Sequence, residues 1–304
     1  MRRAILPLAF AAFLAGCATV APAPVPSLFF DDFSYATPAD MPAAGWQLRD
    51  GTGHPGLPGG RFAADAITLV DDPLQPGNRV LRMTARTDGT GPGTVQAQLC
   101  HQRKYLQGTY AARIRFSDAP RSGVDGDPVI ESFYAVAPLA HPFDPDFSEL
   151  DWEYLPNGGW GSDKTRLYGV SWQTVQLDPW EAHNAAHEEF ASFDGWHVLL
   201  MQVTRNAVHE FVDGREVAVH DGRNVPVSPM TISFNLWFAV NGPLPAGGAP
   251  RVYDEDVDWV FHAKDRVLSP AEVDAQVRAL RAGHVPRMDT VPAPVPARQQ
   301  RCDI

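Results

Sequence analysis

The stretch Phe147-Ser-Glu-Leu-Asp-Trp-Glu-Tyr-Leu155 alternates between acidic and large apolar side chains. A period of two is typical of a β-strand, in which successive side chains point to opposite faces of the sheet. One face of this predicted strand carries Glu149, Asp151 and Glu153. The other face carries Leu150, Trp152 and Tyr154. Burial of the apolar face fixes the register, because a slip by one residue would push three carboxyl groups into the core.

Three carboxyl groups so close together repel one another and contribute nothing to folding, so they need an explanation. The simplest is a solvated strand face. A calcium site is a second, although calcium usually takes its carboxylates from a loop. A glycosidase site is the third, in which one carboxylate attacks or stabilises the anomeric carbon while a second carboxyl protonates the leaving oxygen.

The pattern Glu149-Leu-Asp151-Trp-Glu153 resembles the Glu-x-Asp-x-Glu signature of glycoside hydrolase family 16, the β-jelly-roll glucanases that include lichenases and laminarinases. The resemblance runs in order from about residue 30 to about residue 262. Besides the acidic stretch, the segments that carry it are 108–116, 193–197, 211–214, 235–237 and 257–260. It implies an all-β fold, a concanavalin A-like β-jelly-roll sandwich, and a retaining endo-β-glycanase that hydrolyses β-glucan-like polysaccharide.

The same resemblance makes Glu149 the nucleophile, Glu153 the general acid/base and Asp151 an auxiliary carboxylate. Spacing alone leaves the inverting geometry open, since four strand residues separate the glutamate Cα atoms by about 13 Å. Three close carboxyls cannot all ionise cheaply, so we expect a proton with a raised pKa, held on Glu153 in the free enzyme.

Alternation also predicts the neighbouring cleft residues in the stretch 231–238. Its core face would carry Ile232, Phe234, Leu236 and Phe238. The opposite face would then turn Asn235 and Trp237 toward the substrate, where an amide suits sugar hydroxyls and an indole suits the apolar ring face. Burial of Trp237 in the core is the alternative.

The resemblance adds Gln98, Tyr134 and Phe147 as substrate contacts, although lichenases tend to have a glutamate at the first position and a tryptophan at the third. Trp160 and Trp172 are further aromatic candidates for the cleft or the core. The family also implies a structural calcium at Asp258, a weak signal with one carboxylate. We expect no other cofactor.

Composition restricts the partners. The chain has 304 residues, 44% of them hydrophobic, which suits one all-β domain with short tails. A net charge of −11 and the lack of any Lys/Arg-rich run argue against binding to nucleic acid or to an anionic membrane surface. We expect a monomer that acts on a neutral polysaccharide.

The N-terminus resembles a lipoprotein signal. Arg2 and Arg3 precede an apolar run over 4–14 that is too short to span a membrane, and Leu14-Ala-Gly-Cys17 resembles a bacterial lipobox. We therefore expect a signal peptide over 1–16, acylation of Cys17, a proline-rich spacer over 17–28 and a location outside the cytoplasm on the cell envelope. An ordinary signal peptide with a chance cysteine is the alternative.

The catalytic domain is expected over 29–268, with strands near 80–86, 94–99, 110–116 and 167–173 and a hairpin over 208–220 that turns at Asp213-Gly214. A helix and tail follow over 269–304. Ser269 and Glu272 form a capping box around Pro270, and Gly283 ends the helix. Its apolar stripe consists of Val273, Val277 and Leu280.

The two remaining cysteines, Cys100 and Cys302, can pair or stay free, and an exported compartment favours pairing. A non-hydrolytic carbohydrate-binding protein on the same sandwich is the alternative function, because a fold alone does not decide function. The intact acidic triplet favours the enzyme.

Overall fold

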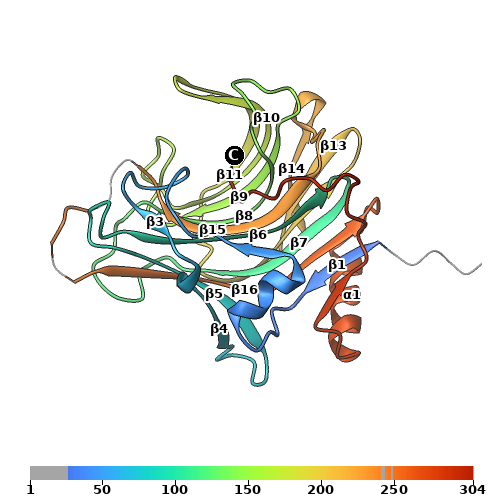
Figure 1. Ribbon diagram of the computed structural model, residues 1–304, viewed down its shortest axis with the longest axis horizontal. Coiled ribbons are helices and arrows are strands. Elements are labelled where there is room, and N and C mark those ends of the chain that lie inside the picture. Colours follow the sequence, from blue (N-terminus) through green and yellow to red (C-terminus); the bar gives the residue numbers. More distant parts are fainter. Residues whose placement is uncertain (1–26, 241–243, 248, 304) are drawn as a thin grey trace, which may run out of the picture.

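The computed structural model describes residues 27–240, 244–247 and 249–303, so Cys17 and the predicted signal lie outside the described residues. Two curved sheets pack face to face (Figure 1). All strand pairs are antiparallel except that of β3 with β6. The prediction of an all-β sandwich with one short helix near the C-terminus is confirmed.

The concave sheet has the strand order β11-β10-β9-β8-β15-β6-β2. In that order the strands are Trp180–Glu189, Arg166–Leu177, Ser148–Leu155, Val129–Ala137, Met230–Phe238, Val95–Tyr105 and Trp46–Leu48. The strand predicted over 147–155 is β9, near the middle of this sheet.

The second sheet has the order β14-β13-β12-β7-β16-β5-β4. Its strands are Arg215–Asp221, Ala207–Val212, Gly195–Val203, Gly108–Phe116, Arg251–Lys264, Arg79–Thr87 and Ile67–Asp71. β1 (Leu28–Asp31) pairs with the end of β16, and β17 (Arg287–Asp289) pairs with β1. β3 (Arg61–Phe62) lies beside β6. Three 3-10 helices occur at Pro38–Ala44, Ala64–Ala66 and Gly222–Asn224.

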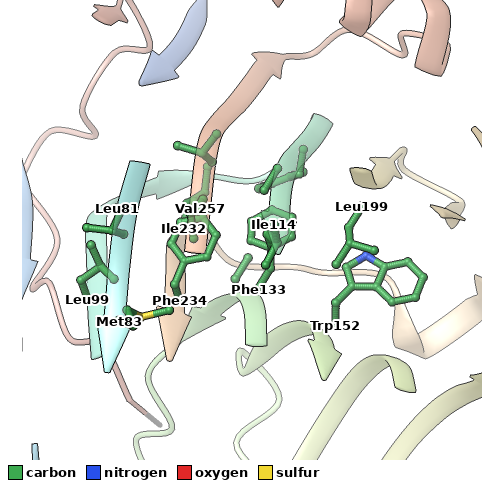
Figure 2. Close-up of a cluster of buried hydrophobic side chains, with 14 of the residues drawn as sticks. Leu81, Met83, Leu99, Ile114, Phe133, Trp152, Leu199, Ile232, Phe234 and Val257 are labelled. Carbon is green, nitrogen blue, oxygen red and sulfur yellow. The ribbon is translucent and has the colours of Figure 1, made fainter. Parts of the chain in front are cut away.

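The main hydrophobic core lies between the two sheets. Figure 2 shows Trp152 of β9 near Leu199 of β12, with Phe133 and Phe234 of the concave sheet close to Ile114 of β7. Leu150, Trp152 and Tyr154 are all fully buried in this cluster. The apolar face of β9 therefore packs as its alternation predicts, and burying three such side chains contributes roughly 1.5–3 kcal/mol each.

Local signals at the hairpin and the helix also hold. Asp213 and Gly214 both have positive φ (50° and 82°), as a type I′ turn requires between β13 and β14. α1 (Pro270–Ala282) begins after Ser269, whose backbone N donates to Glu272 Oε2 at 2.8 Å. Its apolar stripe packs against β1 and β16 on the outer face of the second sheet.

The segment after α1 contacts both sheets. β17 extends the second sheet, and the chain then crosses to the concave face, where the C-terminal segment enters the hollow of the sheet (Figure 1). Cys302 forms a disulfide with Cys100 of β6, with Cα atoms 5.2 Å apart. Within the described residues, no helix is long and apolar enough to cross a membrane.

Candidate functional site

The pairing of β9 with its two neighbours sets which side chains share the concave face. Residues directly opposite each other in antiparallel strands point to the same side. Glu149 lies opposite Trp172, Asp151 lies opposite Tyr134, and Glu153 lies between Ser132 and Tyr168. The register therefore surrounds the acidic face of β9 with aromatic and hydroxyl side chains from β8 and β10.

These side chains line a cleft of about 730 Å³ on the concave face. All three carboxylates line it, together with Trp160, Trp172 and Trp237. Trp160 follows two glycines in a loop after β9, has a φ of 46° and is 45% exposed. Indole rings beside carboxylates in an open cleft form the kind of surface that binds sugars, whose rings have apolar faces and polar edges.

Two of the carboxylates are held by indole N–H groups. Trp172 Nε1 donates to Asp151 Oδ2 at 2.6 Å, and Trp160 Nε1 donates to Glu153 Oε2 at 2.8 Å. Glu149 accepts no hydrogen bond from any described residue. The two indoles fix the directions of Asp151 and Glu153, and the Glu149 carboxylate keeps its lone pairs for a ligand.

Burial of this cluster disfavours ionisation. Desolvation, followed by the charge of Glu153, raises the pKa of Glu149 from 4.5 to about 8. Desolvation also raises the pKa of Glu153 to about 7, against the Trp160 hydrogen bond and the charge of Arg166. Burial and both glutamates raise the pKa of Asp151 well above its ordinary value. The raised carboxyl pKa expected from the sequence is present, and burial raises it on all three groups.

Asn235 and Trp237 line the cleft, as alternation predicts. Asn235 Oδ1, Trp237 Nε1 and the neighbouring Ser132 Oγ are buried and have no hydrogen-bond partner among the described residues. Buried polar atoms normally have partners, so these three are candidates to bind a polar ligand. Trp237 is only 8% exposed and packs on Phe62 and Ile130, so it serves the core and the cleft at once.

Gln98 and Tyr134 line the cleft, and both also make hydrogen bonds to the C-terminal segment. Gln98 Nε2 donates to Tyr134 Oη at 2.6 Å and to the Cys302 carbonyl at 3.0 Å, while Gln98 Oε1 accepts from Arg49 at 2.6 Å. Tyr134 Oη donates to the same Cys302 carbonyl. Phe147 does not line the cleft; it packs beneath it beside Tyr134 and Val136.

Asp258 does not fit a calcium ion. Its carboxylate accepts from Arg113 at 2.7 Å, from Arg281 at 2.7 Å and from Asn78 at 2.8 Å. These contacts hold the pKa of Asp258 below its ordinary value, and two guanidinium charges would repel a divalent cation. Within 27–240, 244–247 and 249–303, no group of three or more His, Cys, Asp or Glu side chains is arranged to hold a metal.

Sequence reasoning missed Tyr168, Trp180, Asn184 and Asp303, which also line the cleft. Tyr168 would have followed from the pairing of β10 with β9, had that register been known. Trp180 begins β11 and meets Trp172 edge-on, with ring centroids 6.1 Å apart. β11 is mostly polar and exposed, so its sequence carries little strand signal.

The fold is similar to several solved structures. A Bacillus licheniformis β-glucanase superposes with a TM-score of 0.56 at 16% identity, over 78% of this chain and 98% of that one. A Bacteroides ovatus family 16 glycoside hydrolase in complex with its product gives 0.57 at 14%, over 76% and 98%. A prokaryotic β-1,3-1,4-glucanase (lichenase) derived from a mouse hindgut metagenome gives 0.52 at 21%, over 78% and 99%.

No family model and no curated protein matches the sequence. At these identities the structural similarity establishes the fold, and it confirms the predicted jelly-roll sandwich.

Replacing Glu149 by Gln should raise stability at alkaline pH and change it little near pH 4. The pKa of Glu149 is raised in the folded state, so the folded protein retains this proton between pH 4.5 and about 8, where the unfolded chain has lost it. Stability therefore falls as pH rises through that interval, and Gln removes this loss. Melting temperatures at pH 4 and pH 9 measure the difference, which we expect to be a few °C at pH 9.

Asp71→Asn, at a side chain 92% exposed, is the control and should show no such pH-dependent gain. An equal melting temperature for wild type and Glu149→Gln at pH 9 would contradict the assigned burial.

Proposed function

We propose that the protein is a retaining β-glycanase that hydrolyses a β-glucan-like polysaccharide by double displacement. The observation that carries the proposal is three carboxylates on one strand in an indole-lined cleft, two of them oriented by indole N–H groups. The similar structures include two named as β-glucanases, which supports this class of substrate.

In the first step Glu149 attacks the anomeric carbon and forms a covalent glycosyl ester, while Glu153 gives its proton to the leaving oxygen. In the second step Glu153 takes a proton from water, and the water oxygen displaces Glu149. Two inversions at the same carbon retain the anomeric configuration. Glu149 suits the attacking role because no described residue donates a hydrogen bond to its carboxylate.

The two glutamates need different protonation states when substrate is bound. Burial raises the pKa of both, whereas attack needs Glu149 ionised and Glu153 protonated. Positive charge that develops at the anomeric carbon stabilises the adjacent Glu149 carboxylate, and a sugar that displaces water disfavours ionisation of Glu153. Asp151, between the two and held by Trp172, raises the free energy of any state with all three groups ionised.

We further propose that the chain is exported and anchored through acylated Cys17. The motif Leu14-Ala-Gly-Cys17 supports this, and the proline-rich stretch that follows is long enough to separate the anchor from the domain.

Azide should distinguish the two glutamates. We expect Glu149→Ala and Glu153→Ala to lower turnover of natural glycan by at least about 10²–10⁴-fold without unfolding the domain. With azide, Glu149→Ala should give an α-glycosyl azide, because azide attacks the face that Glu149 vacates. Glu153→Ala should give a β-glycosyl azide from an activated substrate, because its covalent intermediate still forms.

NMR of the products determines the anomeric configuration of the azide from each variant. Near wild-type turnover by either variant, or an inverted anomer as the first wild-type product, would contradict the assignment.

Alanine substitutions of Trp160 and Trp237 should separate the effect on glycan affinity from the effect on stability. Trp160→Ala should weaken glycan affinity by about two- to tenfold, the value of one aromatic contact, with little change in unfolding free energy because the ring is 45% exposed. Trp237→Ala should weaken affinity and also cost about 3–5 kcal/mol of stability, since the ring is 8% exposed. Calorimetric titration and urea unfolding measure the two effects. A Trp237→Ala protein of unchanged stability would show that its packing role is wrong.

Acylation should be visible at the mature N-terminus. Mass spectrometry of the membrane fraction should find Cys17 as the first residue, carrying acyl chains. A mature protein that begins at another residue, or wild-type protein that is freely soluble after cell lysis, would exclude the anchor.

A further inference from the structure

The segment 300–303 lies in the cleft and is held there by several independent contacts. Cys302 is bonded to Cys100 of β6. Gln300 Nε2 donates to the Cys100 carbonyl at 2.8 Å and to the Gly45 carbonyl at 3.1 Å. Asp303 Oδ2 pairs with Arg49 Nη2 at 3.2 Å. Two of its residues, Cys302 and Asp303, line the same cleft as the carboxylates.

The polar side chains beneath the segment already form hydrogen bonds with the segment or with one another. Gln98 uses its amide oxygen on Arg49 and its amide N–H groups on Tyr134 and the Cys302 carbonyl. The Tyr134 hydroxyl donates to the same carbonyl. A sugar at this place would have to displace a chain segment that is covalently tethered and already satisfies these donors, which would leave buried polar groups unpaired.

The sheet register places the segment close to the carboxylates. Cys100, Ser233, Tyr134 and Asp151 form one cross-strand row through β6, β15, β8 and β9. Segment 300–303 is bound to the first and third members of this row. β8 neighbours β9 at about 4.8 Å, so on this side the segment leaves room for about one or two sugar rings beyond the carboxylates.

The other side of the carboxylates has a different lining. There Trp172 lies opposite Glu149, Asn184 lies opposite Trp172, and Trp180, 60% exposed, extends the aromatic wall. A glycan that crosses β9 thus meets an open aromatic surface toward β11. Toward β6 it meets Asn235 and Trp237 beside a tethered chain segment.

We propose that segment 300–303 is a fixed end wall of the cleft and sets where the glycan is cut. Because the segment closes the cleft toward β6, the protein removes short products of about one or two sugars from a chain end. The sequence instead led us to expect endo action, in which the enzyme cuts within the chain. This proposal rests on the proposed function, since it specifies the cleavage position at the same carboxylates.

Two variants open the wall. One is the double substitution Cys100→Ser and Cys302→Ser, which removes the tether while keeping near-isosteric side chains. The other lacks residues 299–304 and removes the segment itself. Val295→Ala is the matched control, because Val295 lies in the same tail and is 98% exposed. Thermal unfolding establishes that each variant is folded at the assay temperature.

The first measurement compares viscosity with reducing ends during hydrolysis of lichenan and laminarin. Wild type and Val295→Ala should lower viscosity slowly per reducing end and release short products. The truncated protein should lower viscosity at least about tenfold faster per reducing end and release longer products, with the double variant changed in the same direction. Wild-type-like products from a folded truncated protein would overturn the proposal, because the glycan would then pass beside the segment, over Trp237.

The second measurement does not need turnover. In the Glu149→Gln background, with the segment present, affinity should stop rising with the length of the β-gluco-oligosaccharide once the space next to the segment is filled. Without the segment, affinity should keep rising by about tenfold more as sugars are added. Equal length dependence would refute the wall. A wild type inactive on every glycan would refute the proposed function instead, and a protein that also binds none of the oligosaccharides would refute both.

Discussion

The packing of Leu150, Trp152 and Tyr154 into the core is the interaction on which the site depends. These side chains hold β9 in register against the second sheet and so keep three mutually repelling carboxyls on the concave face. The favourable free energy of this burial outweighs the repulsion among the carboxyls. The strand therefore tolerates a carboxyl cluster that does not itself stabilise the fold. Alternate residues of one strand therefore set both the register of the sheet and the position of the three carboxyls.

The neighbouring strand is shaped around this arrangement. Gly169 of β10 lies opposite Trp152, and a Cβ at that position would lie 2.4 Å from Glu210 Oε2 and 3.0 Å from the Trp152 ring. Glycine is thus required by the close approach of an indole and a buried carboxyl. Burial raises the pKa of Glu210 to about 8, and any charge on it adds to the field that raises the pKa of Asp151. A buried carboxyl on the core side of β9 thus affects protonation of Asp151 on the concave side.

The tail shows how a segment distant in sequence can define a site. Cys100 and Cys302 are 202 residues apart, and their bond brings a carbonyl and a carboxylate into a cleft otherwise built from sheet residues. Closing so long a loop stabilises mainly by restricting the unfolded chain, so the same bond contributes to stability and shapes the cleft. Segment 300–303 therefore differs from an ordinary flexible tail, since its position is fixed by a covalent bond, an ion pair and hydrogen bonds to Gln98, Tyr134, Cys100 and Gly45.

The sequence by itself determined the features that depend on local periodicity and turn chemistry. Alternation placed Glu149, Asp151 and Glu153 together and turned Asn235 and Trp237 to the same cleft, while Asp213-Gly214 and Ser269 marked a turn and a helix start. The tertiary structure alone decided what depends on pairing between distant segments. It set the partners of Gln98, Tyr134 and Asp258, the packing of Trp237, and the burial that raises the carboxyl pKa values. The physical reason is that periodicity fixes which face a side chain takes, whereas hydrogen bonding, desolvation and access to a ligand depend on what the rest of the chain brings to that face.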